Sequence, residues 1–419
     1  MIPVSRPAEP EEPVHSLQRL WRGGPAAWNA ALTLPQVLIP FFLLAATAPF
    51  ITQYFVDNYG WTGGEFWVRI LTTCAMYACL ALALNLVVGY AGLLNLGFIA
   101  FFAIGSYAYA LVASDQLNHH FALLPALATV VLVSIGFALL VGVPALRLRG
   151  DYLAILTLAF GLIMRELTLD LDRPPTLFGH QFGPDGLNIT GGTEGIHLVD
   201  PFRLPQWVPL VHGVGLQSRT YYWIFLGFLA LIVFTLLRWR HTRTGRAWIA
   251  VREDELAARA MGVNVFKYRL LAFGASSVAA GITGMIDAAY IHNAFPGNYD
   301  IQQTVLVFIM IILGGLGSIP GAIIGAVLVT VLPFLLQQLV LYKYVVFSLL
   351  LILVMIFRPE GLLGTVSIRP RASLGGTVEL LTAEPETPPD ASIPTLGESA
   401  AELEAATGAI VEPPPPEQQ

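Results

Sequence analysis

The sequence predicts an all-α polytopic integral membrane protein, and three observations support that prediction. Hydrophobic residues make up 55% of the 419-residue chain. Charged residues make up 12%, whereas about a quarter of the residues in a soluble domain are charged. Apolar runs long enough to cross a bilayer, which takes about 20 residues in a helix, recur along most of the chain, and the mean hydropathy is +0.67.

About ten of these runs are candidate transmembrane helices, and a few of them are short. They lie near 35–56, 66–88, 92–113, 121–146, 152–168, 221–238, 267–292, 302–317, 319–340 and 343–357. Together they predict a transmembrane domain over 35–365. We expect 1–34 to be a cytoplasmic arm, because it lacks the order of segments found in a cleaved signal peptide. The acidic, Pro-rich segment 366–419 is predicted to be a disordered cytoplasmic tail.

Lysine and arginine indicate the orientation of the spans, because these residues collect in cytoplasmic loops. Arg147, Arg149, the 238–269 segment and the arginines after the last span fall on one side of the membrane if the N-terminus is cytoplasmic. Both termini are then cytoplasmic. The segment 169–220, with its G-P-D-G and T-G-G-T-E-G stretches, is then a periplasmic loop made of turns.

The segment 238–269 holds eight of the 22 Lys and Arg residues of the chain. Within it, Ala247 to Met261 has helix-forming composition and Gly262 is a stop signal. The pattern predicts one short helix on the cytoplasmic side that binds a partner. Binding to anionic lipid is the alternative, and the acidic run at 253–255 argues against it.

A glycine-rich stretch, Gly89–Gly97, separates two predicted spans almost without a polar loop. Unwound backbone at membrane depth is tolerated where it is buried in protein or lines a water-filled cavity, and transporter sites use such broken helices. The stretch is therefore either part of a substrate path or a tight turn with close packing. A second break, Leu313–Gly325, has the small-xxx-small spacing that favours helix packing. The residues assigned to the substrate path are Gly89, Tyr90, Gly92, Leu93, Leu94, Asn95 and Gly97.

Ionisable residues inside apolar runs are costly in a membrane and are candidates for function. Asp287, in G-M-I-D-A-A-Y, is the clearest of them and joins the candidate path. It lies near the outer end of its span, about a turn and a half from His292. Arg165 and Glu166 also lie near the outer end of a span. We predict a structural role for that pair.

Several classes of function are excluded by what the sequence lacks. There is no G-x-x-x-x-G-K-[ST] stretch, and Lys267 and Lys343 both flank spans, so the chain cannot build a nucleotide-binding P-loop. No His, Cys and carboxylate cluster has metal-ligand spacing, and no nucleophile lies in a recognisable elbow. We therefore expect a chain that is not an enzyme and has no cofactor, metal site or nucleic-acid partner.

Several stretches of the sequence carry a resemblance to a known family: L-N-L-V-V-G-Y-A-G-L-L-N-L-G-F-I-A-F-F-A-I-G-S-Y, L-R-L-R-G-D-Y-L-A-I-L-T-L-A-F-G-L-I-M-R, T-G-G-T-E-G-I, G-R-A-W-I-A-V-R-E-D-E-L-A-A-R-A-M-G-V-N, L-G-G-L-G-S-I-P-G and F-R-P-E-G-L-L. Together they resemble the LivM-type permease of branched-chain amino-acid ABC importers. They occur in the order of that family and cover about 70–365. The resemblance implies a bacterial inner-membrane permease that works with a second related permease, two cytoplasmic ATPase subunits and a periplasmic amino-acid-binding protein.

The resemblance also implies that 238–269 is a coupling loop whose short helix docks in a groove of the ATPase. The general importer pattern E-A-A-x-x-x-G is not matched in full, because Leu256 stands six residues before Gly262. An ion-gradient-driven secondary transporter of a small polar solute, with Asp287 as its carboxylate, is the alternative function. The family carries leucine, isoleucine and valine or related solutes. The positions that match the coupling helix are Glu253, Asp254, Glu255, Ala257, Ala258 and Gly262.

Overall fold

The computed structural model describes the membrane part of the chain and leaves out most of both ends. The residues described are 42–51, 54, 64–116, 119–148, 150–171, 176–177, 180–181, 190–202, 217–335, 348–349, 352, 356–357 and 361–363. The predicted arm 1–34 and tail 366–419, and with them both termini, lie outside the described residues. Their predicted location on the cytoplasmic side stays a prediction.

Five helices in the described residues are long and apolar enough to cross a membrane. They confirm the prediction of an all-α polytopic membrane protein, and they come from five of the ten predicted runs. The five are α4 (Gly64–Asn85), α6 (Leu123–Ala145), α7 (Asp151–Asp170), α8 (Gln217–Arg240) and α11 (Val265–Ile291).

Four further apolar helices are shorter than a full membrane crossing. One is Phe42–Ile51, and the others are α5 (Ile99–Val112), α12 (Ile301–Gly314) and α13 (Ile319–Leu335). The run predicted at 92–113 is thus helical only from Ile99 onward, because the glycine-rich stretch before it is not helical. The last predicted run, 343–357, is mostly outside the described residues, so the total of ten spans stays a prediction.

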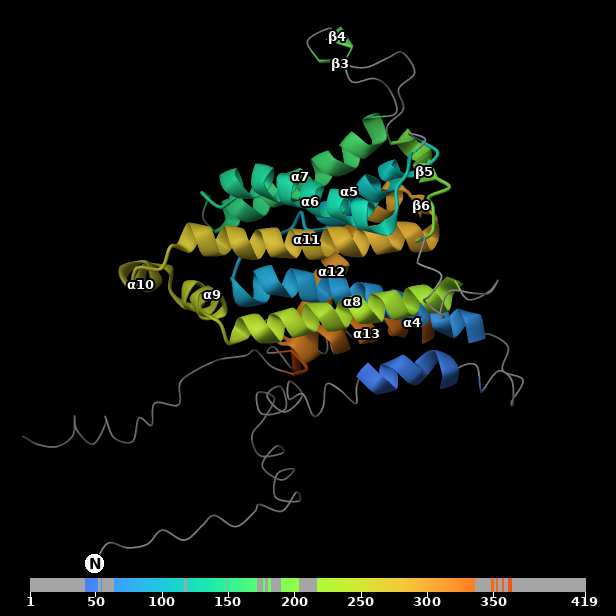
Figure 1. Cartoon of the computed structure of the whole chain (residues 1–419). Helices are drawn as coiled ribbons and strands as arrows, with labels where there is room; N and C mark the ends of the chain where they lie inside the picture. Colours follow the sequence, from blue (N-terminus) through green and yellow to red (C-terminus); the bar gives the residue numbers. More distant parts are fainter. Residues whose placement is uncertain are drawn as a thin grey trace, which may run out of the picture. The chain divides into compact units, whose positions relative to one another are not determined.

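Helix α11 lies at the centre of the described helices and packs against α4, α5, α6 and α8 (Figure 1). On its other flank, α4 packs against α8, α12 and α13. The contact of α11 with α5 is close because glycines face each other. A Cβ on Gly105 would overlap the carbonyl oxygen of Gly281, and one on Gly284 would overlap that of Phe102. Small residues of this kind let two membrane helices approach backbone to backbone.

Short paired segments cover the ends of α5 and α11 that lie away from the basic loop. Strand β5 (Ile196–His197) pairs with β6 (Asn293–Ala294), and β1 (Ala113–Ser114) pairs with β2 (His119–His120). A single turn, η2 (Gly192–Glu194), precedes β5. Strands β3 (Thr176–Leu177) and β4 (His180–Gln181) also pair. Between the end of α7 at Asp170 and the beginning of α8 at Gln217, the described residues of the predicted loop 169–220 form turns and short pairs.

The segment 190–202 is held to these helix ends by several hydrogen bonds. Val199 N donates to His292 O at 3.1 Å, and Asp200 N donates to Ala113 O at 2.7 Å. The Tyr109 hydroxyl donates to Asp200 O at 2.9 Å. The Asp200 carboxylate also lies 2.7 Å from His120 Nδ1. This part of the loop thus lies across the ends of α5 and α11 that are away from the basic loop.

Candidate functional site

The basic loop folds as two short helices, so the prediction of one helix from Ala247 to Met261 is wrong. Helix α9 covers Arg243–Glu253 and α10 covers Glu255–Ala260. The break falls at Asp254, whose backbone is extended at φ −151° and ψ 111°. Its carboxylate accepts hydrogen bonds from Leu256 N at 2.8 Å and Ala257 N at 3.0 Å. A side chain that caps a new helix in this way competes with continuation of the preceding one.

Helix α9 is anchored to the membrane helices by a buried tryptophan. Trp248 is 1% exposed and packs edge-on against Trp239 of α8, with ring centroids 5.4 Å apart. Its Nε1 donates to Tyr268 O of α11 at 2.8 Å. In Figure 1, α9 and α10 lie together at one end of α8 and α11. A displacement of α9 therefore acts directly on both membrane helices.

Helix α10 is held to α11 by an apolar contact and an ion-pair network. Ala258 is buried with Val251 and Val265 in a small apolar cluster. The Glu255 carboxylate accepts from Arg259, and also from Arg269 at 2.9 Å. These contacts attach α10 to the first turns of α11.

The predicted coupling residues thus divide between internal contacts and the surface. Asp254, Glu255 and Ala258 hold the loop together, so Ala258 is not available to touch a partner. Glu253, Ala257 and Gly262 are exposed, and Gly262, at φ +80°, ends α10 in the left-handed conformation that glycine favours. The docking role assigned to this set stays a prediction.

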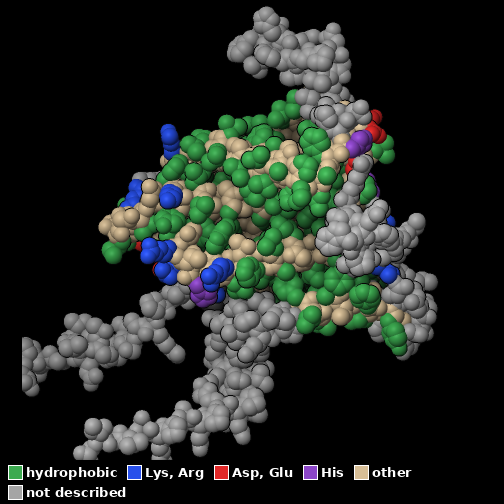
Figure 2. All heavy atoms as spheres, in the orientation of Figure 1, with side chains coloured by type: hydrophobic (Ala, Val, Ile, Leu, Met, Phe, Trp, Pro, Cys, Tyr) green, Lys and Arg blue, Asp and Glu red, His purple; other side chains and the backbone are tan. Residues whose placement is uncertain are grey.

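Two exposed apolar side chains on this loop were not assigned a contact by sequence reasoning. Leu256 is 73% exposed and Met261 is 85% exposed. Lys and Arg side chains gather at the same end of the molecule, while the flank beside it is largely hydrophobic (Figure 2). A polar surface with a few exposed apolar side chains resembles a docking surface more than a lipid-facing one. The signal for Leu256 and Met261 was present in the sequence, because both are large apolar residues in a charged loop.

The two glycine-rich breaks meet beside α9. Helix α4 continues as a π-helical turn, η1 (Leu86–Tyr90). Asn85 Nδ2 donates to Ser318 O at 3.1 Å, and Gly317 N donates to Asn85 Oδ1 at 2.8 Å. From α9, Arg252 Nη1 donates to Gly89 O. We call this set, Asn85, Gly89, Arg252, Gly317 and Ser318, the inner junction.

The inner junction requires glycine at its contact points. A Cβ on Gly89 would lie 2.5 Å from Gly317 N. Gly317 itself has φ +80°, which side chains other than glycine rarely adopt. In the second break, a Cβ on Gly314 would overlap the carbonyl oxygen of Gly321. These close approaches agree with the packing interpretation of the second break.

The residues assigned to the substrate path at Gly89–Gly97 lie mostly inside the protein. Tyr90, Leu93 and Asn95 are buried, whereas Leu94 is 42% exposed. A Cβ on Gly97 would overlap the carbonyl oxygen of Thr157 in α7. The contacts at both ends of the stretch are therefore those of a tight turn with close packing, which is one of the two interpretations of its sequence. The other interpretation, a substrate path through this stretch, stays a prediction.

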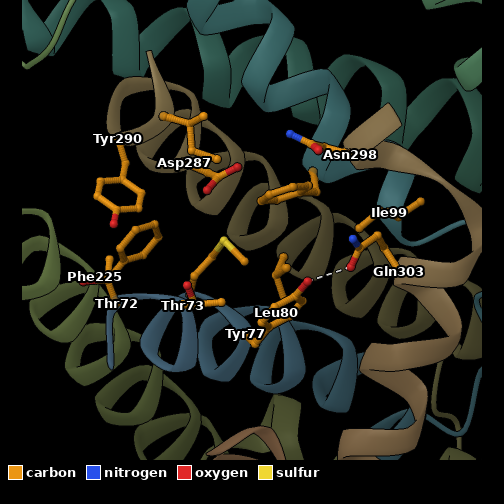
Figure 3. A pocket seen from close by; sticks show the side chains of 13 residues that line it. Thr72, Thr73, Tyr77, Leu80, Ile99, Phe225, Asp287, Tyr290, Asn298 and Gln303 are labelled. Atoms are coloured by element: carbon orange, nitrogen blue, oxygen red, sulfur yellow. Dashed lines mark hydrogen bonds between the residues drawn. The ribbon is translucent and has the colours of Figure 1, made fainter. Parts of the chain in front are cut away.

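Asp287 lies apart from these glycines, in a cavity of about 180 Å³. The walls come from α4, α5, α8, α11, η4 (Pro296–Tyr299) and α12. Asp287 is 5% exposed. Figure 3 shows its carboxylate pointing into the space between Tyr290 and Phe225 on one side and Tyr77 and Gln303 on the other. We call this space the Asp287 cavity.

Polar groups in the Asp287 cavity are few and differ in their bonding. The Tyr77 hydroxyl donates to Gln303 Oε1 at 2.7 Å. The Asp287 carboxylate has no hydrogen-bond or ion-pair partner in the part of the chain that the structure describes. No Lys or Arg is among the described residues that line the cavity.

The second ionisable pair shows a different environment. Arg165 Nη1 lies 2.9 Å from Glu166 Oε1, and the side chains of both residues are more than one third exposed. Each therefore has its counter-charge at the protein surface. A search of the described residues for groups of His, Cys, Asp and Glu able to hold a metal ion finds none.

Comparisons with known proteins place the sequence among transport permeases. Residues 66–356 match the family described as branched-chain amino acid transport system / permease component. The chain is 36% identical over 318 residues to the high-affinity branched-chain amino acid transport system permease protein LivM of Salmonella typhimurium. The aligned segment covers 71% of this chain and 69% of that protein. LivM of Escherichia coli gives the same identity and coverage.

A second kind of permease is also similar to this chain. LivH of Escherichia coli, a permease protein of the high-affinity branched-chain amino acid transport system, is 31% identical over 189 residues, which is 42% of this chain and 58% of LivH. No solved structure matches the chain.

Proposed function

Because the chain belongs to the family of branched-chain amino-acid transport permease components, and so is a permease subunit of an ABC importer, we propose that it carries branched-chain or related amino acids across the bacterial inner membrane into the cytoplasm. In this proposal it pairs with a second, LivH-like permease, since both LivM and LivH are similar to this chain. A periplasmic binding protein delivers the solute. ATP is hydrolysed in two separate cytoplasmic chains.

The coupling of ATP hydrolysis to transport is assigned to α9 and α10. The observation that supports this assignment is the combination of exposed Leu256 and Met261 with a loop that is otherwise fixed to α8 and α11. A rigid loop transmits a push from a partner, and exposed apolar side chains supply the anchors that such a partner binds. The arrangement suits a helix that docks in a groove of an ATPase.

The test is to charge the two anchors in the complete transporter in membrane vesicles. Leu256→Asp and Met261→Asp should each reduce ATP-dependent leucine uptake at least tenfold, because one interface anchor contributes about 2 kcal/mol or more. Membrane abundance should be unchanged, since both side chains are exposed. Leu148→Asp is the matched control, an exposed leucine near the cytoplasmic end of α6 outside the coupling loop, and it should transport normally.

Two results would overturn parts of the proposal. Normal uptake by both variants would remove α10 from the coupling interface. Wild-type uptake that stops when the ion gradients are dissipated at constant ATP would instead support a secondary transporter.

A further inference from the structure

The Asp287 cavity contains a buried carboxylate that has no partner among the residues that the structure describes. Burial of a carboxylate in apolar surroundings is unfavourable unless hydrogen bonds or an opposite charge compensate it. Within the described residues, no such group reaches Asp287. A group supplied from outside the chain would complete the site, and a cation is the group that matches the charge of the ionised carboxylate.

The walls of the cavity favour an organic ammonium over a metal ion. Calcium takes six to eight oxygen ligands, whereas the described lining offers one carboxylate. Tyr290 and Phe225 instead present aromatic rings on the Asp287 side of the cavity (Figure 3). Aromatic faces attract ammonium groups. A volume of about 180 Å³ is far above the ~10–15 Å³ that one water molecule requires, so a small organic molecule can enter.

The opposite side of the cavity offers hydrogen-bond donors. Tyr77 donates to Gln303 Oε1, which leaves the amide NH₂ of Gln303 as a donor. Asn298 adds a second side-chain amide to the lining. Two amide donors without a positive charge suit the carboxylate of a zwitterion. Met76 and Leu80 add apolar surface for a hydrophobic side chain.

The lining of the cavity reaches the end of α11 that lies away from the basic loop. Its lining includes Ile291, which is 45% exposed, and Asn298, which follows the β5–β6 pair in the outer segment. A solute released on the periplasmic side therefore reaches this cavity before it reaches the inner junction.

We propose that the Asp287 cavity is a subsite for an α-amino acid with an apolar side chain, in which Asp287 binds the ammonium group and the amides of Gln303 and Asn298 bind the carboxylate. The proposal rests on the proposed function and names the residues that receive the solute within this chain. It places the subsite on α11, away from Gly89–Gly97.

The test measures direct binding to the complete transporter in lipid nanodiscs without the binding protein. The probes are leucine, 3-methylbutylamine, which lacks the carboxylate, and 4-methylpentanoate, which lacks the ammonium group. Wild type should bind leucine most tightly, the amine more weakly and the acid not at all. Asp287→Asn should weaken leucine and amine binding at least tenfold. Asp170→Asn, an exposed carboxylate at the outer end of α7, is the control and should bind normally.

Two further readouts separate a binding role from a structural one. Asp287→Asn should raise the melting temperature of the ligand-free transporter, because it removes an unpaired buried charge, whereas loss of a structural contact would lower it. Gln303→Glu should reverse the preference, so that the amine binds more tightly than leucine.

The outcomes distinguish this inference from the function on which it rests. Unchanged leucine binding by Asp287→Asn, or unchanged preference in Gln303→Glu, would overturn the subsite while ATP-dependent uptake by wild type leaves the function intact. Absence of that uptake in wild type would instead overturn the function.

Discussion

Arg252 is the residue through which α9 reaches the inner junction, and its replacement should weaken coupling. Its guanidinium donates to Gly89 O, which lies in the π-helical turn η1 that follows α4. Gly317 of the second break makes contact at the same place. The aliphatic stem of Arg252 lies over Gly92, where a Cβ would come within 2.9 Å of Arg252 Cγ. Arg252→Met keeps this stem and removes only the charged donor.

The size of the effect follows from that single interaction. A hydrogen bond with one charged partner contributes about 1.5–3 kcal/mol. Arg252 is largely exposed, so solvent screening lowers the value to about 1 kcal/mol. About 1 kcal/mol corresponds to roughly a fivefold change in the equilibrium between attached and detached states of α9. We therefore expect the number of solute molecules carried per ATP to fall by up to about fivefold.

The assay is leucine uptake and ATP hydrolysis measured together in proteoliposomes that contain the complete transporter. Arg252→Met should hydrolyse ATP at nearly the wild-type rate and transport less. Arg246→Met is the matched control, since Arg246 is exposed in the same helix and donates within the loop, to His241 O at 3.1 Å. Equal transport per ATP in wild type and Arg252→Met would refute the role of the inner junction in coupling.

Two stability predictions test the local structure independently of transport. Asp254→Ala removes the N-terminal cap of α10, which costs about 1 kcal/mol of helix stability. Amide hydrogen exchange should therefore become faster in α10 but not in α4. Unchanged exchange in α10 would show that the cap is dispensable. Gly105→Ala places a Cβ against the Gly281 backbone, and this overpacking should destabilise the α5–α11 contact by about 1–3 kcal/mol. Gly274→Ala is the control, because a Cβ on Gly274 faces open space. The protein with Gly274→Ala should have a melting temperature at or above that of wild type. Equal melting of the two alanine variants would contradict the packing of α5 on α11.

The long helices could be predicted from the sequence because hydrophobicity acts locally. A run such as 267–292 must be helical within a bilayer, since its backbone groups have no other partners there, and α11 covers Val265–Ile291. The interruption of the coupling loop was harder to predict. Asp254 lies in a stretch of helix-forming composition, and only the contact of its carboxylate with two backbone amides shows that it begins a new helix.

Contacts across long sequence separations could not be predicted from one sequence. Asn85 and Ser318 are 233 residues apart, yet they bond directly. Arg252 is one of eight basic residues in its segment, and nothing in the local sequence distinguishes it from the others. For the same reason, the two glycine breaks were interpreted as separate features. Their meeting at the inner junction follows from the packing of α4 against α12 and α13.

Helix α11 connects the two proposed sites, so they are not physically independent. Its first turns carry Val265 and Arg269, which hold α10, and near its other end lies Asp287. A helix of 27 residues spans about 40 Å at 1.5 Å per residue, which matches the thickness of a bilayer with its headgroups. In the proposed coupling, a displacement of α9 and α10 by an ATPase would pass along α11 to the Asp287 cavity. Leucine binding to Arg252→Met, to Asp287→Asn and to the double variant measures that coupling. Coupled sites should give a double-variant effect that differs from the sum of the two single effects, whereas additive effects would show that the two sites act separately.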